Sequence, residues 1–230
     1  MKNKKVLVVA AHPDDEVLGA GATIARHTSE GDEVRVLILG EGVTSRADIS
    51  VSEKKKALEQ LKKSAIVANK ILGVKHVTLA GLPDQQFDTV PLLSINHAIE
   101  KVLREYSPEL IYTHSPTDLN LDHRKTVESS MTAARPTKSS SVLETRVFEV
   151  PSSTEWNFIL PEVFRPNLFV RVSEKEFGKK MKALSAYGVE MRTFPHPRST
   201  EYIRALATVR GGQSGLSLAE AFCVLYRRTP

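Results

Sequence analysis

Short apolar runs alternate with amphipathic segments along the first half of the chain. Apolar runs with the length of buried strands cover residues 5–10, 33–39, 76–80 and 109–112. In the segments between them, such as 53–72 and the stretch after Pro91, apolar residues recur at three- and four-residue steps, which predicts helices. Strands that alternate with helices predict an α/β fold, in which a mostly parallel sheet has helices on both faces.

The alternating pattern changes after about residue 137. A polar loop, TKSSS, follows, but it is too short to separate two domains. Further strands are predicted within residues 146–156, 167–172 and 221–227, and helices near residues 174–191 and 199–209. We therefore expect a single domain over residues 1–230, in which residues 1–137 form the α/β core and residues 138–230 add a C-terminal elaboration of strands and helices.

Composition narrows the class of protein further. The chain has 230 residues, of which 41% are hydrophobic and 26% charged, as in ordinary globular domains. Its longest apolar run, residues 6–11, is too short to span a bilayer and ends in charged residues, so we interpret it as a strand and not as a signal peptide. A single cysteine, Cys223, excludes an internal disulfide and is typical of the reducing cytoplasm.

The net charge of +5 comes from basic residues that are interspersed with acidic ones, and aromatic residues make up only 6% of the chain. A nucleic-acid-binding surface usually gathers basic residues on one face or along one stripe. We therefore expect a small molecule as the ligand and no nucleic acid partner.

Polar residues are concentrated at the ends of two predicted strands. HPDDE, residues 12–16, follows the first strand, and HSPTDLNLDH, residues 114–123, follows the fourth. Ligands of an open parallel sheet bind beyond the carboxyl ends of the strands, at the point where the strand order reverses. If the first strand lies beside the fourth, as in the usual doubly wound order, the two polar stretches meet at that point.

These residue types indicate a metal site with an adjacent base. His12 and Asp15 lie three residues apart on a turn entering a helix and can face the same side, and His123 can supply a third ligand. Two imidazoles and one carboxylate leave a position open for water, which is typical of catalytic zinc, although Fe²⁺ or Co²⁺ also suits such ligands. Asp14 is placed to accept a proton from the metal-bound water as general base. Asp122 is placed to orient a neighbouring group by hydrogen bonding.

Two other interpretations of these stretches stay open. Asp14, Asp15 and Glu16 are also the residue types that an ordinary helix N-terminus favours electrostatically. A sugar- or nucleotide-binding α/β protein that holds Mg²⁺ in its acidic loop is a second alternative, although Mg²⁺ prefers carboxylates and water to two imidazoles. The stretch GAGATIA lies after the acids and inside the predicted helix, so it does not form the glycine-rich turn of a dinucleotide-binding protein.

The two polar stretches also resemble those of a known enzyme family. AHPDDEVLGAG and THSPTDLNLDHRKT resemble the paired motifs of the LmbE/PIG-L-like family of zinc-dependent de-N-acetylases, with softer matches at GLPDQQFDTVPL, AARP, EVPSSTEW and PHPRSTEYIRALATVRGGQSGLSLAEAF. By position, the resemblance implies zinc bound by His12, Asp15 and His123, with Asp14 as general base. It also implies a Rossmann-like sheet and a homo-oligomer.

The resemblance implies hydrolysis of an acetamide. Family members remove N-acetyl groups from amino sugars carried on lipids, thiol conjugates, antibiotics or nucleotides. We therefore expect a cytoplasmic, zinc-dependent N-deacetylase that releases acetate from an N-acetylated amino sugar or its conjugate. The alternatives are an amidase that acts on another amide conjugate, and a metal-dependent binding protein without catalytic activity.

The sequence departs from the family pattern at Asn120. Many relatives have a histidine at this position, which helps to stabilise the oxyanion. Asparagine can donate a hydrogen bond but cannot act as a cationic acid. We expect Asn120 to contribute a hydrogen bond, and His196, in the loop PHPRS, to supply the acid or the oxyanion donor, with His114 as the second candidate.

Substrate contacts are expected from several loops. Arg46 follows the second strand and faces the same crevice, and Arg198 can pair with a phosphate or with sugar hydroxyls. Trp156 can stack on a sugar ring, and we also assign His114 to the substrate-binding group. Asp84, in LPDQQFDT, is interpreted as a turn-capping residue.

Overall fold

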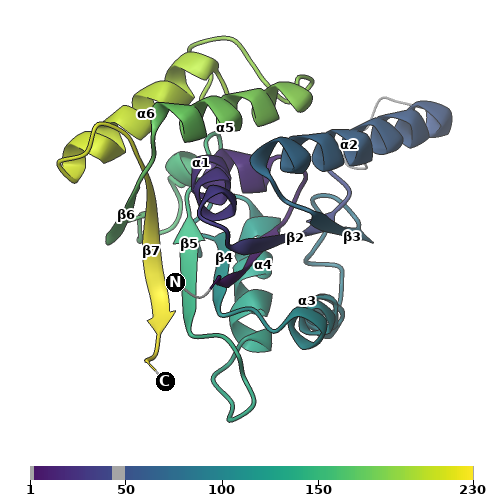
Figure 1. The fold of residues 1–230 in the computed structure, drawn as a ribbon. Helices are drawn as coiled ribbons and strands as arrows, with labels where there is room; N and C mark the ends of the chain where they lie inside the picture. Colours follow the sequence, from purple (N-terminus) through teal and green to yellow (C-terminus); the bar gives the residue numbers. More distant parts are fainter. Residues whose placement is uncertain (1–2, 43–49, 230) are drawn as a thin grey trace.

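The computed structural model describes residues 3–42 and 50–229 (Figure 1). In these ranges the chain forms a seven-stranded sheet with the strand order β3-β2-β1-β4-β5-β7-β6. The strands are β1 (Lys5–Ala10), β2 (Glu33–Gly40), β3 (His76–Leu82), β4 (Leu110–His114), β5 (Glu144–Phe148), β6 (Leu168–Arg171) and β7 (Ala219–Arg227). Strands β1 to β5 pair in parallel, whereas β7 is antiparallel to both β5 and β6.

Helices cover both faces of this sheet (Figure 1). They are α1 (Asp15–Ser29), α2 (Val51–Leu72), α3 (Leu92–Tyr106), α4 (Leu121–Ala133), α5 (Glu174–Ala186) and α6 (Thr200–Gln213). Helices α1, α2, α5 and α6 lie on one face, and α3 and α4 lie on the other. The expected α/β fold is thus confirmed, and the predicted boundary near residue 137 falls in the connection between α4 and β5.

Strand β1 is central to the fold because both of its faces are covered. Val6 and Val8 pack in the core beneath α1 and α2, whereas Leu7 and Val9 pack in the core beneath α3. A strand that is buried on both faces has a continuous apolar sequence, and for this reason the ends of β1 were predicted correctly. β1 pairs with β2 on one side and with β4 on the other, so the strand order reverses beside it, as predicted.

Local signals determine several element ends. Ser50 and Glu53 form a capping box at the start of α2, and Gly73, with a φ of 89°, ends that helix. The strand predicted within residues 146–156 is shorter than expected. β5 ends at Phe148, and after Pro151 the chain forms a 3₁₀ turn, Thr154–Trp156. Proline lacks the N–H that a continuing sheet ladder needs.

A buried ion pair joins the middle of α1 to the C-terminal elements. Lys180 Nζ, on α5, lies 2.6 Å from Glu220 Oε1, on β7, and donates to the Leu18 carbonyl at 2.7 Å. The Glu220 carboxylate accepts hydrogen bonds from the N–H groups of Ala22 and Thr23 at 3.1 and 2.7 Å. In a regular helix Ala22 N–H would bond the Leu18 carbonyl. The ion pair therefore provides a partner for each group of this backbone bond: Glu220 for the N–H of Ala22, and Lys180 for the carbonyl of Leu18.

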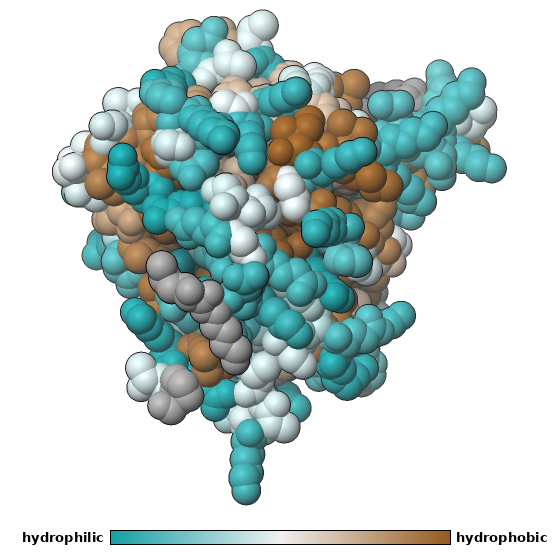
Figure 2. Space-filling view, in the orientation of Figure 1, coloured by the Kyte–Doolittle hydropathy of each residue, from teal (hydrophilic) through white to brown (hydrophobic). Residues whose placement is uncertain are grey.

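Apolar residues are collected in two cores, one on each side of the sheet. On the face shown in Figure 2, hydrophilic residues predominate and hydrophobic residues form smaller patches. Among the helices that the structure describes, none has the length and apolar character needed to cross a membrane.

Candidate active site

Two turns at the carboxyl edge of the sheet bring the polar stretches together. After β1 the chain passes through residues 11–14 and enters α1 at Asp15, and after β4 it passes through residues 115–120 and enters α4 at Leu121. Asn120 caps α4, because its side-chain oxygen accepts the N–H of Asp122 at 2.8 Å. Since β1 and β4 are parallel neighbours, both turns lie at the same end of the sheet.

Three buried side chains converge where these turns meet. Asp15 Oδ2 lies 3.3 Å from His12 Nδ1 and 3.2 Å from His123 Nε2. One ligand atom from each of the three residues lies within 4.8 Å of the others. Asp15 Oδ1 is buried and has no hydrogen-bond partner among the residues that the structure describes, which is costly for a carboxylate oxygen unless it binds a cation. The donor set and this oxygen without a partner fit a divalent metal ion.

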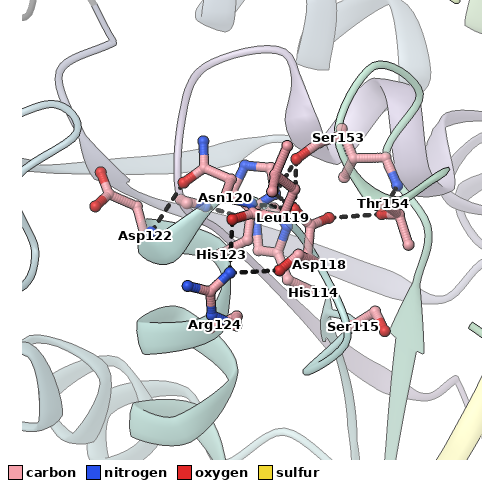
Figure 3. Close-up of polar contacts among 12 residues, drawn as sticks. His114, Ser115, Asp118, Leu119, Asn120, Asp122, His123, Arg124, Ser153 and Thr154 are labelled. Atoms are coloured by element: carbon pink, nitrogen blue, oxygen red, sulfur yellow. Dashed lines mark hydrogen bonds and ion pairs between the residues drawn. The ribbon is translucent and has the colours of Figure 1, made fainter. Parts of the chain in front are cut away.

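Each of these histidines is oriented by a carboxylate on its far side. His12 Nε2 donates to Asp122 Oδ2 at 3.0 Å, and His123 Nδ1 lies 3.2 Å from Asp118 Oδ1. Asp118 is itself fixed by the hydroxyls of Ser153 and Thr154, the latter at 2.6 Å (Figure 3). Carboxylates that bond the outer ring nitrogen fix the tautomer and the orientation of a metal-ligating histidine. Both imidazoles therefore direct their other nitrogen toward Asp15.

Asp84, interpreted above as a turn-capping residue, also lies in this cluster. It is buried, and its Oδ1 lies 3.3 Å from His12 Nε2. His12, Asp84 and Asp122 thus form a second converging group, on the other nitrogen of the same imidazole. Asp122 Oδ1, however, accepts the N–H of Phe87 at 3.0 Å, whereas Asp15 Oδ1 has no such partner within residues 3–42 and 50–229. This difference favours the group around Asp15 as the metal site.

The two histidines lie in an excess of negative charge. Burial opposes protonation of His12, but the surrounding carboxylates outweigh burial and raise its pKa to about 10; they belong to Asp122, Asp15 and Asp84. Burial also opposes protonation of His123, but the carboxylates of Asp15 and Asp118 outweigh burial and raise its pKa to about 9. A buried site with such an excess of carboxylates stabilises a bound cation.

Asp14 is held at the edge of the cluster in an unusual conformation. Its φ is 110°, and its side chain makes no capping hydrogen bond to α1, so helix capping does not explain its presence. A non-glycine residue at such a φ costs about 1–3 kcal/mol and persists where the surroundings hold it. Burial raises the pKa of Asp14 to about 8, although the neighbouring Arg198 lowers it. A carboxylate with a pKa near neutrality can accept and return a proton.

Arg198, expected to bind the substrate, contacts Asp14 directly. Its Nη1 donates to Asp14 Oδ2 at 2.8 Å and lies 3.6 Å from Glu190, while its Nε donates to Ser152 Oγ at 2.8 Å. These contacts connect the segment after β5 and the segment between α5 and α6 to the turn after β1. Arg198 therefore holds the carboxylate of Asp14 in place.

A cavity of about 330 Å³ opens above the cluster. Of the residues that the sequence analysis singled out, those that line it are His12, Asp14, Asp84, Asn120, His123 and Arg198. Asp15 and Asp122 are buried below it. Further lining residues, which the sequence interpretation did not assign, are Gln85, Ser152, Ser153, Glu190 and Arg192. Gln85, Ser152 and Ser153 belong to the softer motif matches GLPDQQFDTVPL and EVPSSTEW, whereas Glu190 and Arg192 lie in none of the quoted motifs.

Three further predicted residues are described by the structure but are not named among those that line the cavity. His114 is fully buried, accepts the N–H of Ala11 at 2.8 Å, stacks on the ring of His123 at 4.0 Å between ring centroids, and has its Nε2 3.6 Å from Asp15 Oδ2, so it packs against the cluster. Trp156 and His196 pack edge to face, 5.7 Å apart, and are not among the residues that line the cavity. Arg46 lies outside the described residues.

Asp118 is a residue of the cluster that the sequence interpretation missed, although HSPTDLNLDH contains it. We expect Asp118→Asn to weaken metal binding about 10- to 100-fold, because the ring of His123 loses its anionic partner. A competition titration with a chelator measures this affinity. Asp88→Asn makes the same chemical change on an exposed carboxylate of the loop after β3 and should leave the affinity unchanged. Equal affinities in the two variants would show that Asp118 does not orient a ligand.

The fold and the site define a class: an α/β protein with a histidine–aspartate cluster at the carboxyl edge of a parallel sheet, beside the point where the strand order reverses. The chain belongs to the PIG-L family, also called LmbE-like, because the family model described as GlcNAc-PI de-N-acetylase matches residues 7–134, more than half of its length. The match includes both polar stretches.

Individual relatives agree with this assignment. The diacetylchitobiose deacetylase of Thermococcus kodakarensis is 27% identical over 224 residues, which cover 94% of this chain and 81% of the relative. The solved structure of the N,N'-diacetylchitobiose deacetylase of Pyrococcus horikoshii superimposes on this chain with a TM-score of 0.78 at 20% identity. The superposition covers 98% of this chain and 85% of the deacetylase chain. GalB, a 4-carboxy-2-hydroxymuconate hydratase of Pseudomonas putida, has the same fold, with a TM-score of 0.78, 23% identity and coverage of 99% and 98%.

Proposed function

We propose that the protein is a metal-dependent deacetylase that hydrolyses the acetamide of an N-acetylated amino sugar or of its lipid, nucleotide, antibiotic or thiol conjugate. The observation that carries the proposal is the arrangement of one cavity, in which a candidate metal site and a separate carboxylate, Asp14, lie side by side. Because the fold also occurs in a hydratase, the proposal rests on this site and on membership of the family, and not on the fold.

His12, Asp15 and His123 would hold the cation, for which we propose Zn²⁺, with Fe²⁺ or Co²⁺ as alternatives for the same nitrogen and oxygen ligands. When bound, the cation supplies Lewis acidity toward a water molecule and the acetamide carbonyl. Asp118 and Asp122 keep the two imidazoles oriented. The low solvent exposure of these side chains strengthens the electrostatic interactions among them.

Asp14 accepts the proton of the attacking water. Its carboxylate lines the cavity, and Arg198 holds one of its oxygens at 2.8 Å. Asp14 then returns the proton to the amine, which must be protonated to leave. The side chain of Asn120 also lines the cavity, and because its oxygen caps α4, its NH₂ group is the part available to donate to the developing oxyanion. The products are acetate and a free amino sugar.

We propose His196 as an alternative acid. Its Nδ1 accepts the N–H of Arg198 at 3.0 Å, which leaves its other nitrogen as the one that could carry a proton to the substrate. Trp156, packed against His196, would then contact the part of the substrate beyond the acetylated sugar. We further propose that the protein acts in the cytoplasm on a small molecule, not on nucleic acid, and as a homo-oligomer.

A panel of N-acetylhexosamines, free and as phosphate, nucleotide, lipid and thiol conjugates, tests the function. Acetate release is measured with metal-stripped protein and again after Zn²⁺ is restored, and the unacetylated sugars give the background. We expect release from at least one member, abolished by stripping and recovered with the metal. Tight metal binding without release from any member would overturn the deacetylase proposal in favour of another amide or of a binding protein.

A further inference from the structure

Glu16 is a buried carboxylate for which the mechanism above has no role. It is fully buried in the first turn of α1. Its Oε1 accepts hydrogen bonds from Tyr187 Oη at 2.7 Å and from Asn69 Nδ2 at 2.8 Å, and its Oε2 accepts the backbone N–H of Asp14 at 3.2 Å. Asn69 belongs to α2, and Tyr187 follows the end of α5. Glu16 thus connects two helices to the backbone of the proposed base.

The backbone of Asp14 determines where its carboxylate lies. An aspartate side chain has only two rotatable bonds, so its carboxylate follows the backbone closely. With a φ of 110°, this residue needs neighbours that keep it in an unfavourable conformation. The Asp14 carbonyl accepts the N–H groups of Val17 and Leu18 at 3.0 and 2.8 Å. Glu16 binds the other side of the same residue, its N–H.

We propose that Glu16 is a positioning residue, which fixes the backbone of Asp14 so that the proposed base points into the cavity. Glu16 is not named among the residues that line the cavity, so it acts on the reaction indirectly, and the contact that it makes with the proposed base is its hydrogen bond to the Asp14 N–H. The proposal rests on the proposed function, in which Asp14 accepts the proton of water.

The number of donors around Glu16 explains why a glutamate suits this place. Donors meet both oxygens of the carboxylate, Tyr187 and Asn69 at Oε1 and the Asp14 N–H at Oε2, and a carboxylate can accept at both. A glutamine has one oxygen and one NH₂ group. With its oxygen toward Tyr187 and Asn69, its NH₂ would meet the N–H of Asp14, donor against donor. Glu16→Gln therefore keeps the size of the side chain and removes the anchor of Asp14.

The kinetic test compares Glu16→Gln in two backgrounds. In the otherwise unchanged enzyme we expect kcat to fall about 10- to 100-fold, with KM and metal content retained, because a displacement of about 1 Å has an effect of this size. In the Asp14→Ala background we expect no further fall, since residues that act as a unit are not additive. Equal falls in both backgrounds would assign Glu16 to folding alone and overturn the proposal.

Tyr187→Phe is the matched control. It removes one donor from Oε1 but leaves the contact between Oε2 and Asp14 intact, so kcat should stay near that of the unchanged enzyme. A loss of kcat as large as that of Glu16→Gln would show that any disturbance of this buried network slows the reaction, against a specific role for the Asp14 anchor.

A second measurement needs neither a variant nor a substrate. In the unchanged protein labelled with ¹⁵N-aspartate, the Asp14 amide should be protected from hydrogen exchange, because its N–H is bonded to a buried carboxylate. Exchange as fast as that of unbonded loop amides would overturn the proposal. If instead the amide is protected but no substrate is hydrolysed, the positioning of Asp14 stands and the proposed function fails.

Discussion

Replacing Asp14 with alanine is expected to lower the turnover of acetamide hydrolysis about 10²- to 10⁴-fold, the usual contribution of a positioned general base. Bound metal should be retained, because the atoms that converge on the candidate metal site belong to His12, Asp15 and His123. Steady-state acetate release gives the turnover, and elemental analysis of the purified variant gives the metal content. This pair of results distinguishes a group that acts in the reaction from one that binds the metal.

His12→Ala is the contrasting variant. It removes one nitrogen of the site and leaves Asp14 in place, so both metal and turnover should be lost. Full activity of Asp14→Ala would remove this residue as the base. Loss of metal from Asp14→Ala would instead place its carboxylate among the ligands.

Lys180→Met is expected to lower the free energy of unfolding by about 3–5 kcal/mol. The substitution leaves the carboxylate of Glu220, only 6% exposed, without its positive partner, and it leaves the Leu18 carbonyl without the Lys180 donor. Urea unfolding measures the change. The midpoint should fall while the slope of free energy against urea stays constant, since the surface exposed on unfolding is similar.

The double variant Lys180→Met/Glu220→Gln is the control for charge. Here no unpaired charge remains, and the glutamine oxygen can still accept a backbone N–H of α1, so the loss should be smaller than that of Lys180→Met alone. A double variant that is less stable than Lys180→Met would show that the charge of Glu220 stabilises α1 without its partner.

The arrangement of the sheet was predictable because its central strands are buried on both faces. The run 5–10 coincides with β1, and the meeting of the HPDDE and HSPTDLNLDH stretches follows from the pairing of β1 with β4. Where the pattern was less regular, the observed ends differ from the predicted ones, as for β5, which ends at Phe148. Chemical types at strand ends therefore carried most of the information about the site.

What the sequence could not give was the direction in which each side chain points. His114 ends a strand next to the cluster, yet its ring is fully buried and stacks on that of His123. Trp156 and His196 lie 40 residues apart and pack against each other, a contact between two loops that neither motif indicates. Asp118 belongs to a stretch that the sequence analysis singled out, but its role depends on the orientation of the His123 ring, which the sequence does not show.

The candidate ligands come from opposite ends of the α/β part of the chain. Asp15 and His123 are brought together only when β4 has paired with β1, so the unfolded chain has no preformed site for a cation. Any ion held there by the native protein alone adds its binding free energy to folding, about 2.7 kcal/mol at a free concentration of one hundred times Kd. The melting temperature would then rise with the concentration of free metal. In a cell short of metal, a larger fraction of this protein would be unfolded.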